Sequence, residues 1–390
     1  MSDINPEAKR LLEDVKKCPI CRGTNRLLFE GPPLSSNRYL DSICASVGVQ
    51  NFDLLNLFRL YTCNDCGVLY FDPHLSLNTR LKMFTVHFPD HGIGWSRILG
   101  AERLTDRESP AIISVVRRYL NFSHYAEVNC PMMGLLPQLI KNKNFSTNKN
   151  YSFNKDQPIF FKHGRGAIWL VFQFFTGFFL FLERLRNKSR HILSYNSKVA
   201  INNFIYKHQS ILPFSWITKT LTVGRASRKY EPKLSTVSHM NPEVGTVSLL
   251  TIPTTQGWGN ACVRFNASCY QLIPPIPIEY AKTNELRFDL IGFFNTLDHL
   301  DDPLTVLKIT LELSSAIIIR SHRYVKNGSQ HALFFTETFW DNLDILIPNI
   351  KVIKLTDQAL AVLGREKLGS GSESDDLYLI VRGTELKANS

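Results

Sequence analysis

The sequence predicts an α/β protein in which a small cysteine-rich module precedes a parallel sheet covered by helices. Two Cys-x-x-Cys pairs, CPIC and CNDCG, mark the module near the N-terminus. The run 288–293 is apolar except for Asp289, and SSAIIIRSHR contains a second apolar segment of strand length. Strands that are apolar on both faces are typical of parallel sheets with helices on either side. These patterns together predict the fold class.

Length and composition are those of an ordinary globular protein. The chain has 390 residues, of which 44% are hydrophobic and 20% charged. Its formal net charge of +11 is scattered, which fits an acidic partner or simply a solvated basic surface, and it carries no specific nucleic-acid signal. The first residues, MSDINPEAKRLLEDVKK, lack the apolar core of a signal peptide. We therefore expect a cytoplasmic protein with reduced cysteines.

Four cysteines form the most specific pattern in the sequence. Cys18 and Cys21 make one Cys-x-x-Cys pair, and Cys63 and Cys66 make the other. Two such pairs can supply four thiolates to one tetrahedral zinc ion with no open position, which predicts a structural site that stabilises the module. Two unrelated thiol pairs or a redox motif are the alternatives. Cys44 lies between the pairs and is predicted to be a buried thiol.

The order of strand and helix patterns supports a doubly wound sheet. A short β-like run ends at Val128 and leads into a helical pattern, and GTVSLLTIP is the next candidate strand. After the strand 288–293, Asp302 and Pro303 stand where an N-cap and the first helical residue are expected. The later runs IKVIKLTD and DDLYLIVRG predict two terminal strands.

Several of these segments resemble one known family. CGVLYFDPHLS after the second cysteine pair, FPDHGIGW, and RFDLIGFFNTLDHLDDP are similar to segments of class I S-adenosylmethionine-dependent methyltransferases that carry an N-terminal zinc ribbon. Many members of this group act in sugar or polysaccharide pathways. The resemblance implies a Rossmann-like methyltransferase sheet with a zinc ribbon and methyl transfer to a sugar or related polar acceptor, including a nucleotide-sugar.

The same resemblance implies a cofactor site, but its glycine-rich turn is altered. In EVNCPMMG, Asn129, Pro131 and Met133 stand at the three glycine places of the family. Asn tolerates a left-handed φ, whereas Pro has a fixed φ and no N–H to donate. The strand end TIPTTQ lacks the carboxylate that would bind the ribose. The residues implied to bind S-adenosylmethionine are Glu127, Asn129, Cys130, Gly134, Asp289 and Asp298.

The family motif also suggests a catalytic residue. His299 in LDHLDDP is the candidate base, although a histidine there can also cap the following helix or pack against the cofactor. His91 in FPDHGIGW is a second candidate. A relative that has lost catalysis and serves in binding or in assembly near a membrane is the competing class of function, because the glycine turn and the ribose carboxylate are both altered.

An insertion divides the predicted sheet. We expect a zinc-ribbon module at 1–90, the first part of the methyltransferase-like domain at 91–141, a helical and partly apolar insertion at 142–244, and the remainder of the domain at 245–390. Within the insertion, 166–182 contains only Gln173 and Thr176 as polar residues. This segment is compatible with a buried or dimer-forming helix, an in-plane membrane anchor or a short membrane span.

Overall fold

The computed structural model describes most of the chain outside the insertion. The described residues are 6–30, 44, 48–50, 54–82, 104–128, 134–141, 145–147, 151–152, 233–234, 245–252, 275–300, 302–324, 331, 333–369 and 374–383.

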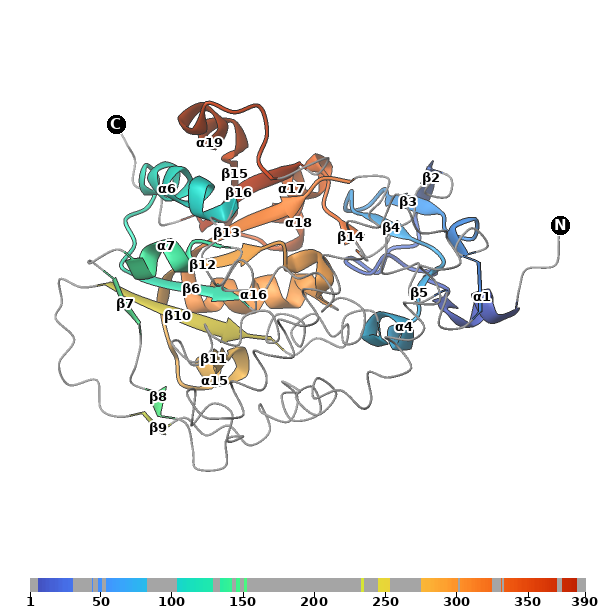
Figure 1. Ribbon diagram of the computed structural model, residues 1–390, viewed down its shortest axis with the longest axis horizontal. Helices are drawn as coiled ribbons and strands as arrows, with labels where there is room; N and C mark the ends of the chain where they lie inside the picture. Colours follow the sequence, from blue (N-terminus) through green and yellow to red (C-terminus); the bar gives the residue numbers. More distant parts are fainter. Residues whose placement is uncertain are drawn as a thin grey trace, which may run out of the picture.

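A mostly parallel sheet forms the centre of the protein (Figure 1). Within the described residues it has eight strands. Seven of them follow one another across the sheet in this order: β11 (Pro275–Pro277), β10 (Gly245–Thr251), β6 (His124–Val128), β12 (Phe288–Phe294), β13 (Ser314–His322), β16 (Asp375–Arg382) and β15 (Ile350–Lys354). The eighth, β7 (Phe145–Thr147), pairs with the first residues of β10.

The order of the strands is that of a doubly wound sheet. If β6, β10, β11, β12, β13, β15 and β16 are counted as strands one to seven, the order across the sheet is 3-2-1-4-5-7-6. The first five follow the Rossmann order and run parallel, and β16 lies antiparallel between β13 and β15. The predicted α/β class with a Rossmann-like sheet is confirmed, and the two terminal strands lie where the sequence predicted them.

Both faces of the sheet are covered by helices, which explains the apolar strands. Buried side chains fill nearly all of β12 and β13. One face packs against α6 (Leu104–Arg117), α7 (Leu136–Lys141) and α19 (Thr356–Leu363). The other packs against α15 (Ile278–Thr283), α16 (Pro303–Leu313), α17 (Glu337–Asp341) and α18 (Leu343–Leu346).

The start of α16 confirms the predicted cap. Asp302 is the N-cap residue, and its Oδ1 accepts a hydrogen bond of 3.1 Å from the backbone N–H of Thr305. Pro303 occupies the first helical position, where a backbone N–H would have no acceptor within the helix, so proline loses no hydrogen bond there. This sharp helix start fixes the length of the connection between β12 and α16.

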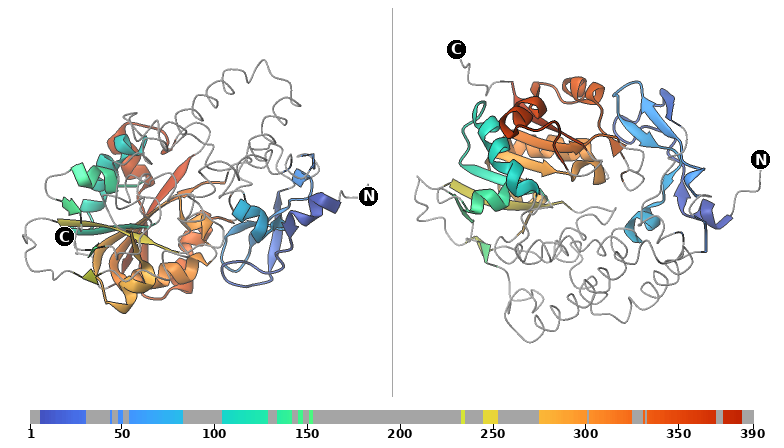
Figure 2. Two further views of the ribbon diagram at one scale, coloured as in Figure 1. Left: turned by 60° about the horizontal axis from the view of Figure 1, so that its bottom comes forward. Right: turned by 45° about the horizontal axis from the view of Figure 1, so that its top comes forward.

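The cysteine-rich module lies beside the sheet (Figure 1 and Figure 2). Its four-stranded antiparallel sheet runs β14-β4-β3-β2, and β1 pairs with β5 in a second small sheet. The module's own elements are α1 (Pro6–Arg10), β1 (Leu12–Glu13), β2 (Arg26–Glu30), β3 (Leu60–Cys63), β4 (Leu69–Phe71), β5 (His74–Leu75) and α4 (Leu77–Lys82). The remaining strand, β14 (Leu333–Phe334), comes from the C-terminal half of the chain.

The module and the central sheet share one hydrophobic core. Cys63, Cys66 and Val68 belong to the same buried cluster as residues of β12, α16 and α17. In addition, Thr336 Oγ1 donates a hydrogen bond of 2.6 Å to the carbonyl oxygen of Gly67. The contact between module and sheet is therefore built from apolar packing, the β14 pairing and this hydrogen bond. The predicted domain boundaries stay predictions.

Most of the predicted insertion lies outside the described residues. Its described parts are β7, β8 (Tyr151–Ser152) and β9 (Lys233–Leu234), of which β8 and β9 pair antiparallel. The apolar segment 166–182 is not among the described residues, so its helical character stays a prediction. In the part of the chain that the structure describes, no helix is both long and apolar enough to cross a membrane.

Candidate functional site

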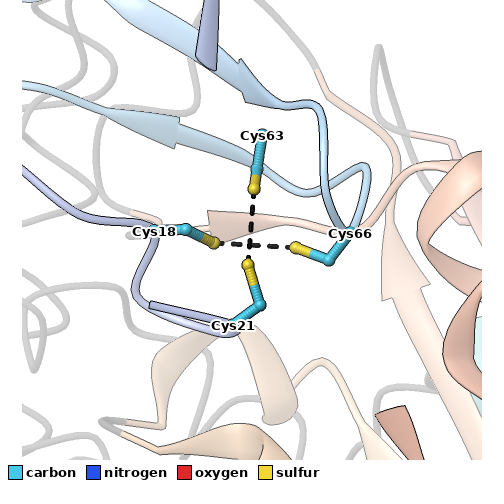
Figure 3. Close-up of side chains that lie close together, drawn as sticks. All are labelled: Cys18, Cys21, Cys63 and Cys66. Carbon is cyan, nitrogen blue, oxygen red and sulfur yellow. Dashed lines mark hydrogen bonds between the residues drawn. The ribbon is translucent and has the colours of Figure 1, made fainter. Parts of the chain in front are cut away.

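Four cysteine side chains converge in the N-terminal module, as predicted (Figure 3). Cys18 and Cys21 lie in the turn before β2, Cys63 ends β3, and Cys66 lies in the turn before β4. The Sγ atoms of Cys18 and Cys66 are 3.6 Å apart, and those of Cys21 and Cys63 are 3.5 Å apart. All four sulfur atoms lie within 4.8 Å of one another, so one ion can contact them all.

Each cysteine pair lies in its own backbone turn, and the two turns have the same hydrogen-bond pattern. The N–H of Arg22 donates to the carbonyl oxygen of Cys18 at 3.0 Å, and the N–H of Gly67 donates to that of Cys63 at 2.8 Å. Arg22 and Gly67 both have left-handed φ angles, 63° and 78°. This repeated turn orients two sulfur atoms per pair toward the centre of the cluster.

The chemistry of this donor set fits a structural zinc ion. Cys18, Cys63 and Cys66 are fully buried, and four thiolates complete a tetrahedral shell without an open position. Without a metal ion, the hydrogen bond with Cys66 lowers the pKa of Cys18. The hydrogen bond with Cys18 raises the pKa of Cys66 and burial raises that of Cys21, so a bound ion would have to displace protons from these thiols. The cluster can therefore bind a metal and stabilise the module, but it offers no coordination position for a substrate.

The second candidate region lies where the strand order of the large sheet reverses. The chain passes from β6 outward to β10 and β11 and then returns to β12 on the other side of β6. Ligands of open α/β sheets bind outside the carboxyl ends of the strands at such a point. Two buried side-chain oxygens here, Oε1 of Glu127 and Oδ1 of Asn295, have no hydrogen-bond partner among the described residues. They are acceptors that a ligand could satisfy.

Glu127 is the predicted acidic residue at the end of the first strand. Its Oε2 accepts hydrogen bonds from the Tyr125 hydroxyl at 2.8 Å and from the Leu136 N–H at 3.2 Å. Burial raises the pKa of Glu127 to about 7. A Cβ atom on Gly134 would lie 2.1 Å from Oε2, so the carboxylate requires glycine at that position. Glu127 and Gly134 thus form one unit at the start of α7.

The altered glycine turn of the implied cofactor site lies outside the described residues, and the strand end that the sequence showed to lack a carboxylate lies only partly within them. Asn129, Cys130, Pro131 and Met133 are not among the described residues. The last described residues of the β10 region, Thr251 and Ile252, are buried and carry no carboxylate. The ribose contact that the family resemblance implies therefore has no carboxylate at this strand end in the described chain.

Asp289 lies at the amino end of β12, about 20 Å along the strand from Asn295. Its Oδ2 accepts hydrogen bonds from the N–H groups of Ser123 and His124, at 2.7 and 2.8 Å, and from the Ser123 hydroxyl at 3.0 Å. These contacts join the start of β12 to the loop before β6. The assignment of Asp289 to cofactor binding stays a prediction, and its described contacts are those of a structural residue.

Asp298 and His299 lie beyond the carboxyl end of β12, in the 3-10 turn Leu297–His299. Both are buried, and His331, which precedes β14, lies against them. Nδ1 of His331 is 2.5 Å from Oδ2 of Asp298, and the rings of His299 and His331 have centroids 4.6 Å apart. The structure thus adds a second histidine to the predicted pair.

Burial determines the protonation of this cluster. It lowers the pKa of His299 to about 3, so the imidazole is neutral at pH 7. Burial raises the pKa of the Asp298 carboxyl, but the charges of the surrounding histidines, when they are protonated, and the hydrogen bond with His331 more than offset this and lower the pKa below its usual value. Asp298 is therefore ionised at neutral pH and lies beside a neutral imidazole.

A buried network of charged groups continues from this cluster. Nδ1 of His322 is 2.6 Å from Oδ1 of Asp375, and the His322 and His331 rings are 5.0 Å apart. Arg320 donates to Oδ2 of Asp375 at 2.6 Å and to Oε2 of Glu108 at 2.7 Å. The network joins α6 to the carboxyl end of β13 and the amino end of β16.

Sequence reasoning identified only part of this arrangement. His322, His331, Asp375, Arg320 and Glu108 were not predicted as site residues. Antiparallel pairing of β13 with β16 sets His322 opposite Asp375, a relation that only the strand register reveals. His331 gives no local signal either, since it precedes a strand of only two residues.

Comparisons with known proteins give little similarity. No protein-family model and no curated protein matches the chain. Two solved structures of the N-terminal domain of EvdMO1, one in the presence of SAH and D-fucose and one with SAH bound, are each 12% identical to it with a TM-score of 0.23. The match covers 36% of this chain and 67% and 66% of theirs. A structure of EvdMO1 is 15% identical, with a TM-score of 0.20 and 36% and 32% coverage.

Proposed function

We propose that this chain is a methyltransferase-like protein with a site for a small polar ligand, of the S-adenosylmethionine type, at the carboxyl ends of β6 and β12. The observation that carries the proposal is the pair of buried acceptor oxygens on Glu127 and Asn295, at the point where the strand order reverses. An unpaired buried acceptor costs about 1–3 kcal/mol. A ligand with amino or hydroxyl donors, both of which S-adenosylmethionine carries, would remove this cost.

The fit to S-adenosylmethionine is incomplete, so we expect weak binding. The β10 region ends in Thr251 and Ile252 where the family resemblance implies a carboxylate. A missing charged hydrogen bond of this kind costs about 1.5–3 kcal/mol, or roughly ten- to a hundredfold in affinity. Pro131 removes one N–H donor from the preceding turn. Together these changes predict a dissociation constant in the millimolar range.

The proposed reaction is methyl transfer to a sugar or related polar acceptor. S-adenosylmethionine would supply a methyl group for in-line attack, and the chain's residues would orient the acceptor and take up its proton. His299 is the proposed base, because its imidazole is neutral and lies beyond the carboxyl end of β12. With a pKa of about 3 it is a weak base, so catalysis would be slow.

A second candidate function is a relative without catalytic activity. The specific observation in its favour is that Oε2 of Glu127 already accepts hydrogen bonds from Tyr125 and Leu136, while the β10 strand end lacks a carboxylate. In this candidate the fold serves to bind a partner or to assemble near a membrane. A membrane contact or a homo-oligomer contact through 166–182 is part of this proposal.

The four cysteines are proposed to hold one structural zinc ion in either case. Cys18, Cys21, Cys63 and Cys66 would bind it, and the ion would join the turn before β2 to the turn before β4. Because the sulfur cluster belongs to the core shared with the large sheet, the ion would also support the contact with α17.

Isothermal titration of the full chain with S-adenosylmethionine and S-adenosylhomocysteine tests the proposed ligand. We expect millimolar binding, and a gain of tenfold or more in the triple variant Asn129→Gly, Pro131→Gly, Met133→Gly, because the backbone can then approach the ligand and a donor N–H returns. Asn295→Gly is the variant expected to lose affinity. It removes the acceptor Oδ1, and glycine tolerates the left-handed φ of 49° at this position, so binding should weaken without backbone strain.

The outcomes of this titration separate the two candidates. Weak binding by the natural chain with a tenfold or greater gain in the triple variant, the result expected above, supports the proposed ligand and leaves at most slow catalysis, close to the inactive relative. Micromolar binding by the natural chain, with weaker binding by the triple variant, would mean that the altered turn is an adapted site and would favour the enzyme. If neither chain binds either compound, the proposed ligand class is wrong.

A further inference from the structure

We propose that Asp298, His299 and His331 form a second metal site, for a divalent first-row transition ion, separate from the four cysteines. Their ligand atoms all lie within 4.8 Å of one another, and all three side chains are buried. The proposal concerns metal binding and does not depend on S-adenosylmethionine. It is an alternative to the role of His299 as a base, because an imidazole whose lone pair binds an ion cannot also accept a proton.

The donor set is one that proteins use for such ions. Two imidazoles and one carboxylate bind Zn²⁺ or Fe²⁺ in sites that keep open positions. Ligand atoms at about 2.0–2.2 Å from one ion lie roughly 3 Å apart. Nδ1 of His331 and Oδ2 of Asp298, now 2.5 Å apart, would therefore separate slightly, and the His299 ring would move inward.

The charge of the cluster also favours a cation. The Asp298 carboxylate is buried, and its neighbours in the described part of the chain are the imidazoles of His299 and His331. The nearest guanidinium of the network, on Arg320, is already bound by Asp375 and Glu108. Buried charges are stable when they are paired or coordinate a metal.

The surrounding residues would hold the ligands in place. The His322 and His331 rings pack in a T-shaped arrangement, at a centroid distance of 5.0 Å and an interplanar angle of 64°. Oδ1 of Asp375 lies 2.6 Å from Nδ1 of His322 and so holds the His322 ring in place. Partners behind the ligands orient imidazoles and tune affinity in known metal sites. The His322 and Asp375 pair fits this supporting role.

Three protein ligands would leave coordination positions for an oxygen ligand. The class of molecule that such an ion recognises is a polar compound with a hydroxyl or carbonyl oxygen, which the ion would polarise as a Lewis acid. The site lies just beyond the carboxyl end of β12, where the sheet topology already places small-molecule ligands.

Elemental analysis of the full chain tests the proposal. The protein is equilibrated with Zn²⁺ or Co²⁺ and freed of excess ion by gel filtration. We expect two ions per chain in the natural protein, and one in Asp298→Asn and in His331→Gln, which keep the size of the side chain but remove a ligand. The ion that remains, bound by the cysteines, shows that these variants are folded.

His124→Gln is the matched control, because it removes an exposed imidazole distant from the cluster. This variant should keep two ions. The proposal is overturned if Asp298→Asn and His331→Gln both hold as many ions as the natural protein. That result would leave the cluster as a hydrogen-bonded histidine–carboxylate group and would place every bound ion elsewhere.

Discussion

The carboxyl group of Glu127 combines a raised pKa with an oxygen that has no hydrogen-bond partner in the described chain. It is fully buried, and burial raises its pKa to about 7. It also keeps one oxygen without a partner in the described chain, although Tyr125 and Leu136 donate to the other. Perturbed acids in such positions are candidates for ligand contact.

The raised pKa of Glu127 predicts a pH-dependent stability. The folded state keeps the proton between pH 4.5 and about 7, whereas the unfolded state releases it, so stability should fall as pH rises through this window. The cost above pH 7 is roughly 3 kcal/mol. Glutamine does not titrate, so in Glu127→Gln the free energy of unfolding should fall less between pH 5 and pH 8 than it does in the natural chain, as measured by urea unfolding.

The exposed Glu279 supplies the matched control for this experiment. Glu279→Gln should leave the difference between pH 5 and pH 8 as it is in the natural chain. If Glu127→Gln gives the same pH profile as the natural protein, burial does not raise the pKa of this carboxyl.

At the scale of elements, the second cysteine turn is packed directly on α17. Gly67 has a φ of 78°, and a Cβ atom there would lie 2.8 Å from the backbone N of Phe339 and 2.9 Å from Cβ of Thr338. Neither the turn nor the helix backbone can move away without disturbing the core that they share. Glycine is required here by both conformation and space.

Gly67→Ala should therefore be more destabilising than conformation alone explains. Gly364 is the matched control, because its φ of 62° is also left-handed and a Cβ atom added there would meet no atom within 4 Å. We expect Gly364→Ala to cost about 1–2 kcal/mol. Gly67→Ala should cost roughly 1–3 kcal/mol more because of the overpacking, as measured by denaturant unfolding. Equal costs would contradict the close packing of the turn on α17.

At the scale of the whole molecule, the module and the central sheet are connected by segments distant in sequence. β14 pairs its Leu333 with Tyr70 and its Phe334 with Leu69. Both β14 residues are buried. The N-terminal module thus depends on residues from the C-terminal half of the chain to complete its sheet.

The sequence predicted those parts of the fold that have strong local patterns. β10, β12, β13 and β16 are strands of seven to nine residues that each contain an apolar stretch, and α16 carries a clear cap. β14 has only two residues, and its pairing joins segments more than 260 residues apart. No local pattern can indicate such a contact, because it depends on the packing of the completed sheet.

The same reasoning applies to the candidate sites. Each Cys-x-x-Cys pair is a local motif that indicates metal binding, so the sequence could predict one cluster of Cys18, Cys21, Cys63 and Cys66. The contact of His331 with Asp298 depends instead on where the chain returns after β13. His299 was predicted from a motif, but its neighbours required the structure.

The central claim, a ligand site at the carboxyl ends of β6 and β12, is tested most directly by hydrogen exchange with mass spectrometry. S-adenosylhomocysteine at several times its dissociation constant should slow exchange in peptides covering 125–136 and 293–300. Peptides covering β2, β3 and β4 should be unchanged, since the cysteine cluster offers no open position. Slower exchange confined to other segments, or no change in the natural chain and in the triple glycine variant, would contradict the account.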